Sequence, residues 1–115
     1  MANTFKVITK ANVTSADVIY TVAGSTTTVL LGIMLGNTTS SAITATVSLG
    51  SDTSSRAGNN DEANQTVELI TSTSIPGNSS LELLSGNKVI METTDTLSVT
   101  GSGAIDVALS VMEIT

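Results

Sequence analysis

A strict alternation of apolar and hydroxyl side chains is the feature of this sequence that most restricts its fold. Residues 43–49 read ITATVSL, in which every second side chain is apolar and the others are Thr or Ser. Successive side chains of a β-strand point to opposite faces, so this pattern predicts a strand with one face buried and the other in water. Thr strengthens the prediction because its branched β-carbon favours extended backbone.

The same alternation recurs along the whole chain, interrupted by turn residues such as Gly24-Ser25 and Pro76-Gly77. It predicts further strands at residues 5–10, 17–23, 27–35, 65–71, 80–84, 88–92, 96–100 and 104–114. No stretch has the 3.6-residue periodicity of an amphipathic helix.

Some of these strands carry more specific expectations. In residues 17–23 we expect three alternate side chains to share one face: Val18, Tyr20 and Val22. In residues 65–71 we expect Val67 and Leu69 to face inward. Residues 27–35 read TTVLLGIML, a nearly continuous apolar run that predicts a central strand with both faces covered.

About eight or nine strands at this spacing predict an all-β fold, a single antiparallel β-sandwich of the jelly-roll or immunoglobulin-like kind. We expect the sandwich to span residues 14–115 and residues 1–13 to form an N-terminal strand or an assembly arm. The lack of Trp and Cys argues against a true immunoglobulin core. Phe5 and Tyr20 are the only aromatic residues, so Val, Ile, Leu and Met must fill the core. We expect so thin a core to depend on neighbouring subunits.

Composition excludes several classes of function. The absence of Cys and His removes disulfides, thiolate metal ligands and the commonest acid–base group at neutral pH. Four basic and ten acidic residues give a net charge of -6, which repels phosphate backbones, so no nucleic-acid partner is expected. The apolar run at residues 29–35 is too short to cross a bilayer, so no membrane partner is expected. We expect no cofactor and no metal ion, and a chain that is not an enzyme.

Carboxylates offer the alternative to that expectation. Glu82, Glu92 and Asp95 lie close in sequence and could flank a pocket as the two carboxyl groups of a glycosidase do. The simpler interpretation places such residues in water on the outer faces of strands. We expect Asp95 to accept hydrogen bonds within its own turn, and Asp106 to face outward from the last strand.

The polar loop at residues 50–63 has two further interpretations. Its oxygen ligands are of the hard kind that Ca²⁺ prefers: Asp52, Asn59, Asn60, Asp61 and Glu62. No EF-hand spacing supports a calcium site, so a plain polar loop is favoured. The loop could instead reach a neighbouring subunit, with Arg56 as anchor and Asn59, Asn60 and Asp61 beside it.

The N-terminal segment is the second candidate for contacts with a neighbour. Lys6 and Lys10 supply half of the positive charge in the chain. This asymmetry suggests that Phe5, Lys6 and Lys10 contact a more acidic subunit.

The C-terminal third has a recognisable succession of turns and strands. Its parts are Ile75-Pro76, the apolar residues 81–84, Gly86-Asn87, residues 89–92, the run DTLSV at 95–99, and the final apolar strand at 107–114. Residues 75–115 resemble small β-sandwich virion proteins of tailed bacteriophages, notably those of aquatic bacteria. Many such proteins have Gly before the Asp, where this chain has Thr94.

The resemblance implies a structural role in a phage particle. We expect a capsid decoration (cement) protein that binds the outside of the head and contacts the major capsid protein or other virion subunits. It would be made in the host cytoplasm and act on the capsid surface as a homo-oligomer, with a trimer favoured. The alternatives are a neck or tail component, or a sandwich module that binds a receptor or carbohydrate.

Overall fold

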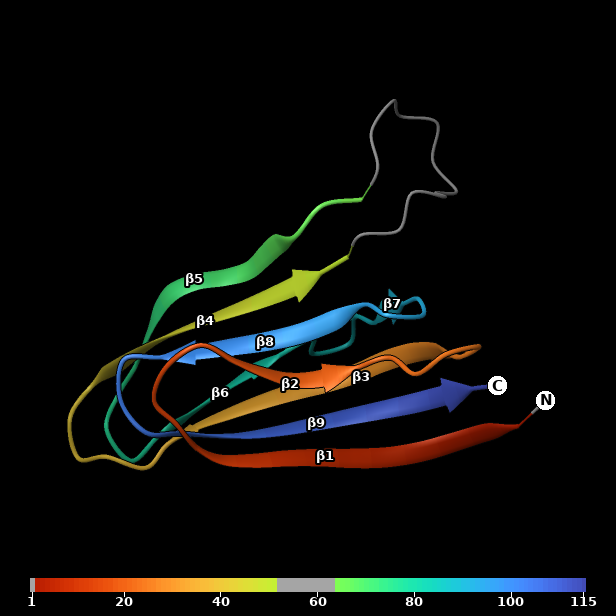
Figure 1. Ribbon diagram of the computed structural model, residues 1–115. Coiled ribbons are helices and arrows are strands. Elements are labelled where there is room, and N and C mark those ends of the chain that lie inside the picture. Colours follow the sequence, from red (N-terminus) through yellow and green to blue (C-terminus); the bar gives the residue numbers. More distant parts are fainter. Residues whose placement is uncertain (1, 52–63) are drawn as a thin grey trace.

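The computed structural model describes residues 2–51 and 64–115, and these form nine strands in two antiparallel sheets (Figure 1). The strands are β1 (Asn3–Val13), β2 (Asp17–Thr21), β3 (Thr27–Asn37), β4 (Ile43–Gly50), β5 (Val67–Ile75), β6 (Ser80–Leu83), β7 (Val89–Met91), β8 (Thr96–Gly101) and β9 (Ile105–Ile114). No helix is present in the described ranges, and therefore none that could cross a membrane. The predicted all-β sandwich is confirmed.

The order of the strands shows which kind of sandwich this is. The first sheet runs β1-β9-β3-β6, with β7 pairing with β3 beyond the end of β6. The second sheet runs β2-β8-β4-β5. Most consecutive strands lie in opposite sheets, and β1 and β2 pair with the late strands β9 and β8. This is the connectivity of a jelly roll, so the structure selects it over the immunoglobulin-like alternative.

The core fills the space between the sheets with aliphatic side chains and one methionine. Its largest fully buried side chains come from strands of both sheets and include Leu30, Ile33, Leu35, Ile75, Met91, Leu97, Ile105 and Leu109. None of the fully buried side chains in the described residues is aromatic. The sequence-based expectation for the core is therefore correct in kind.

The expectation for residues 27–35 is only half correct. These residues lie in β3, which has hydrogen-bonded neighbours on both sides within its sheet. Leu30, Ile33 and Leu35 are buried against the second sheet, but Met34 is 47% exposed and Leu31 is half-buried. The outer face of β3 is open because the second sheet covers only one side of the first.

The two edge strands of the second sheet agree with expectation only in part. Val18 is 55% exposed whereas Val22 is buried, because the pairing of β2 with β8 shifts register between Val18 and Tyr20. A shift in register at a β-bulge changes which side chains share a face, and simple alternation does not reveal it. Val67 lies opposite Leu49 on the core side, as expected, but it is 50% exposed because it is the first residue of the edge strand β5. Leu69 packs against the core, as expected.

The turn before β8 is held by Asp95, as expected. Its Oδ2 accepts a hydrogen bond from the backbone N–H of Glu92 at 2.9 Å, and its carbonyl accepts one from Val22 at 2.9 Å. Thr94 adopts φ 73°, a left-handed conformation in which glycine is unstrained and a β-branched residue is rare. Gly at this position would relieve the strain that Thr94 carries.

The central strand β9 offers a direct test of this core. Replacing the fully buried Leu109 with Ala should lower the free energy of unfolding by about 2 to 5 kcal/mol, since it removes packed methyl groups and leaves a cavity. Ser110→Ala, at the next and exposed position, should change it by less than about 0.5 kcal/mol. Urea denaturation measures both, and equal effects would contradict the assignment of inner and outer faces.

Candidate assembly surface

The N-terminal segment is an edge strand of the first sheet. β1 pairs with β9 in one regular register from Asn3 to Lys10, and Val13 at its end is buried in the core. Alternation along β1 separates its side chains into two sets. Ile8 packs against the core between the sheets, whereas Phe5 on the outer face is 72% exposed.

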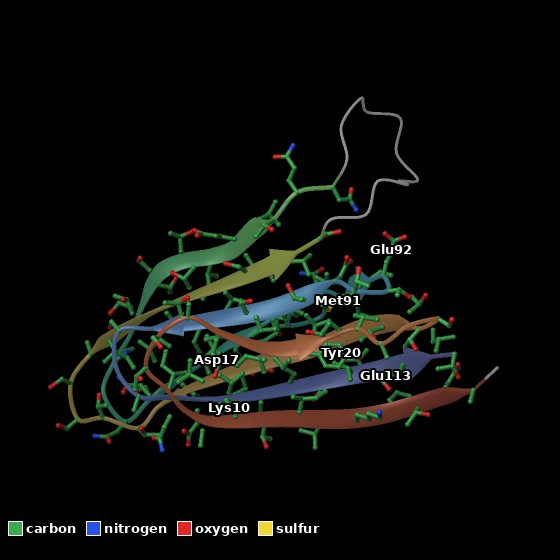
Figure 2. The ribbon with its side chains drawn as sticks, in the orientation of Figure 1. Lys10, Asp17, Tyr20, Met91, Glu92 and Glu113 are labelled. Carbon is green, nitrogen blue, oxygen red and sulfur yellow. The ribbon has the colours of Figure 1, made fainter. Side chains whose placement is uncertain are left out.

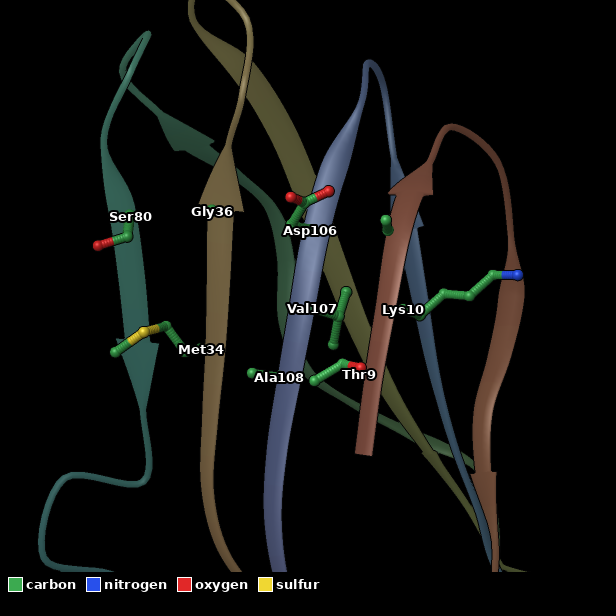
Figure 3. Close-up of a pocket in the computed structure, with 9 residues that line it drawn as sticks. Thr9, Lys10, Met34, Gly36, Ser80, Asp106, Val107 and Ala108 are labelled. Carbon is green, nitrogen blue, oxygen red and sulfur yellow. The ribbon is translucent and has the colours of Figure 1, made fainter. Parts of the chain in front are cut away.

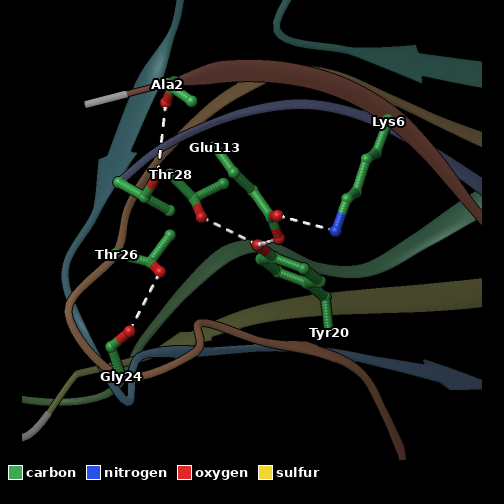
Figure 4. Close-up of polar contacts among 8 residues, drawn as sticks. Ala2, Lys6, Tyr20, Gly24, Thr26, Thr28 and Glu113 are labelled. Carbon is green, nitrogen blue, oxygen red and sulfur yellow. Dashed lines mark hydrogen bonds and ion pairs between the residues drawn. The ribbon is translucent and has the colours of Figure 1, made fainter.

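Lys6 is engaged within the chain. Its ammonium group lies 2.8 Å from Oε1 of Glu113 on β9, whose other carboxylate oxygen accepts a hydrogen bond of 2.5 Å from the Tyr20 hydroxyl (Figure 4). The hydroxyl of Thr28 lies 2.8 Å from that of Tyr20. This polar cluster joins β1, β9 and β3 of the first sheet to β2 of the second sheet.

The cluster shifts two pKa values in opposite directions. Hydrogen bonds from Lys6 and then Tyr20 lower the pKa of Glu113 below its ordinary value of 4.5. Burial raises the pKa of Tyr20 above 10.0, and the hydrogen bond to Glu113 raises it further.

Lys10 has a looser partner at the other end of β1. Its Nζ lies 3.9 Å from Oδ2 of Asp17, and the two side chains are 54% and 41% exposed (Figure 2). An ion pair so open to water contributes little to stability. Both lysines expected to contact an acidic neighbour therefore have acidic partners inside the chain, and such a contact would require them to exchange partners.

The outer face of the first sheet carries an apolar row that crosses four strands. Phe5 of β1 lies opposite Met112 of β9, Met112 lies opposite Val29 of β3, and Val29 lies opposite Ile90 of β7. Directly paired residues of antiparallel strands place their side chains on the same face. Phe5 and Ile90 at its ends are 72% and 58% exposed, whereas Val29 between them is buried at 8% and Met112 is half-buried.

More apolar surface continues along the same face. Val7 is 68% exposed, and Met34 lies in a parallel row opposite Ala108. Past Met34 the face is hollowed to a volume of about 340 Å³, where Gly36 and Ala108 provide little or no side chain (Figure 3). Four of the six exposed large apolar side chains in the described residues thus lie on one face: Phe5, Val7, Met34 and Ile90.

The three carboxylates considered for a catalytic pair do not share one site. Glu92 and Asp95 lie in the same turn before β8, the first exposed and the second buried, whereas Glu82 is exposed on the outer face of β6, opposite Met34. Asp106 is exposed, as expected, and its Oδ1 accepts a hydrogen bond from the backbone N–H of Asn12 at 3.1 Å. In the described part of the chain, no group of three or more carboxylates is placed to hold a metal ion.

The loop candidates cannot be placed on this surface. Arg56, Asn59, Asn60 and Asp61, together with the calcium-ligand candidates Asp52 and Glu62, lie outside the described residues. Of the predicted contact residues, the structure therefore locates only Phe5, Lys6 and Lys10, all on β1.

Sequence reasoning did not identify Val29, Met34, Ile90 and Met112 as parts of one surface. The sequence did contain a signal. In residues 29–31 and 33–35 the side chains on both faces of the strand are apolar, whereas a strand buried on one face only requires apolar side chains on that face alone. We interpreted that run as a strand covered on both faces. The structure shows instead that the described residues cover only the inner face of this strand.

Comparison with known proteins adds little to this picture. No model of a known protein family matches the sequence, and no curated protein is significantly similar to it. Among solved structures, the fold is similar to a chain from a study of Bacillus endospore appendages described as a family of disulfide-linked pili. The two chains are 14% identical with a TM-score of 0.48, over 99% of this chain and 87% of the other. So distant a likeness carries no argument about function.

The polar cluster predicts how stability depends on pH. Because the pKa of Glu113 is lowered in the folded state, its contribution is present above pH 4.5 and is lost as the pH falls through the folded value. Because the pKa of Tyr20 is raised, its contribution is present below pH 10.0 and is lost as the pH rises through the folded value.

Urea denaturation at a series of pH values measures this dependence. Glu113→Gln should flatten the loss of stability in acid, whereas Glu82→Gln, a change at an exposed position, should leave the profile of the unmodified protein. Identical acid profiles for all three proteins would contradict the role given to Glu113.

Proposed function

We propose that this chain is a non-enzymatic structural subunit of a tailed-bacteriophage particle, a decoration protein that binds the outside of the capsid. The observation that carries the proposal is the apolar outer face of the first sheet, formed by Phe5, Val7, Met34 and Ile90 with Val29 and Met112 between them. Exposed apolar side chains that gather on one face are typical of a contact with another protein.

The face is large enough for a specific contact. The strands β1, β9 and β3 have 11, 10 and 11 residues, and β6 and β7 add four and three beside them. At about 4.8 Å between strands and about 3.3 Å per residue, they give a flat area on the order of 600 Å². Stable protein interfaces bury about 800 Å² per partner. Because side chains project from the sheet, its accessible area is larger than the flat area and can reach this value. Fully burying one large apolar side chain contributes about 1.5 to 3 kcal/mol, so a few such residues suffice for a stable contact.

Charge supports a position on the exterior of the particle. The net charge of -6 opposes contact with packaged DNA. On the outer face itself, the charged residues Glu82 and Asp106 lie beside the hollow, away from the row that ends in Phe5 and Ile90. The face therefore suits an apolar patch on a shell subunit such as the major capsid protein.

The fold is compatible with this role without selecting it. Jelly rolls occur in viral coat proteins and also in lectins, so architecture alone does not separate a virion subunit from a glycan-binding module. Glycan sites stack sugar rings on exposed aromatic side chains. Phe5 is exposed but Tyr20 is tied into the polar cluster, which favours the virion role.

Binding to undecorated phage capsids tests the proposal directly. We expect the purified chain to cosediment with capsids and to saturate them at a fixed ratio of chains to shell subunits. A ring-sized oligomer without affinity for capsids would move the assignment to the neck or tail. A chain that ignores capsids but binds glycans would support the module alternative.

A pair of matched substitutions tests the face itself. Ile90 and Val18 have similar exposure, 58% and 55%, but Ile90 belongs to the outer face of the first sheet and Val18 to the edge strand β2 of the second. Ile90→Glu should weaken capsid binding at least tenfold, because a carboxylate would be buried against apolar surface. Val18→Glu should leave binding unchanged. Equal effects of the two substitutions would contradict a contact through the outer face.

A further inference from the structure

We infer that the free edge of β1 pairs with β1 of a second copy of this chain, antiparallel and about a two-fold axis. The inference deepens the proposed structural role by naming a partner for the subunit. It rests on the edge of the sheet, whereas the capsid contact rests on its face.

The backbone pattern shows which groups the edge offers. Ala2 and Thr115 exchange both backbone hydrogen bonds, at 3.2 and 3.0 Å, so the N–H and C=O of Ala2 point toward the C-terminal strand. The regular register continues through Lys10, and in an antiparallel ladder such bonded pairs alternate with non-bonded pairs. The backbone groups of Asn3, Phe5, Val7 and Thr9 therefore point away from β9, to the free edge.

This edge has only part of the protection that edge strands usually carry. Edge strands are kept from pairing by bulges, proline, short length and charged side chains, including charges that point inward. β1 has no proline and no register shift from Asn3 to Lys10. Its inward-pointing charges are Lys6 and Lys10. Lys6 forms an ion pair of 2.8 Å with Glu113 and Lys10 lies 3.9 Å from Asp17, so their charge is partly balanced within the chain.

The other described edges are protected in these ways. β2 has five residues and a register shift, and β6 and β7 have four and three residues. β5 is longer, but its pairing shifts register twice and Ser72 within it has φ 45°. A long and regular free edge occurs in the described chain only at β1. The other edge strands of a second copy are therefore poorer partners for β1 than its own β1.

A second copy suits the edge in charge and in symmetry. The strand carries two lysines and no acidic residue, and its partners Glu113 and Asp17 neutralise them, so two copies can approach without strong repulsion despite the net charge of -6. About a two-fold axis, β1 of each copy donates backbone N–H groups to the other copy and accepts hydrogen bonds from it at its C=O groups.

Side chains restrict the register of this pairing. An axis at Lys6 would set two ammonium groups directly opposite each other, which is unfavourable. An axis at Val7 pairs Val7 with its own copy and Phe5 with Thr9, both favourable cross-strand pairs on the outer face. It also joins the two outer faces into one apolar surface of double width. The result is a dimer, in place of the trimer favoured from the sequence.

Proline at an outward-pointing position tests the pairing. Val7→Pro removes an N–H that points to the free edge, and it breaks no hydrogen bond to β9. Edge strands tolerate proline at such a position. We expect light scattering to show a concentration-dependent dimer for the unmodified chain and a monomer for Val7→Pro. Val7→Thr retains the N–H and should still dimerise. The N–H of Thr9 also points to the free edge. If circular dichroism shows that Val7→Pro is unfolded, Thr9→Pro replaces it in this test.

Amide exchange followed by NMR gives a test without substitution. The amides of Phe5, Val7 and Thr9 should exchange at least tenfold more slowly at high protein concentration, while those of Lys6 and Ile8, bonded to β9, should be protected at every concentration. Concentration-independent exchange at Phe5 and Val7, or a Val7→Pro variant that remains dimeric, would overturn the inference. A chain that binds capsids but never dimerises would refute the pairing alone, and a dimer that does not bind capsids would refute the proposed function alone.

Discussion

The register of β9 is the constraint on which the faces of this protein depend. Its alternate residues Ile105, Val107, Leu109 and Val111 are all buried, and the strand pairs with β1 on one side and β3 on the other. A slip of one residue would exchange the buried set for the outward set, which includes Asp106 and Ser110. One strand thus fixes both the core and the apolar row outside it.

The polar cluster at Glu113 helps to hold β9 in the same register. It lies near the C-terminal end of β9, where Lys6, Tyr20 and Thr28 converge from three other strands. A half-buried carboxylate is costly unless hydrogen bonds and an opposite charge satisfy it. Because these partners are available only in the observed pairing, the cluster favours the correct alignment of β1, β2, β3 and β9 over alternatives.

The sequence predicts where the strands lie along the chain better than how they pair and in which register. Alternation and turn residues locate nearly every strand, because period-two burial is a local property. The exposure of Val18 could not be predicted, because it depends on a register shift against a strand distant in sequence. The surface could be predicted only in part, for the same reason. Phe5 was identified from its own segment, but its row with Met112, Val29 and Ile90 exists only once four strands are aligned.

The two ends of the described chain meet at one corner of the sandwich, where Ala2 and Thr115 are joined by two backbone hydrogen bonds (Figure 1). A short linker could therefore close the backbone into a ring without disturbing either sheet. New ends could then be opened at the exposed turn of Ser85 and Gly86, between β6 and β7. Such a rearranged chain would keep every strand pair while moving its attachment points, so that cargo fused to it would project from a different corner of the same scaffold.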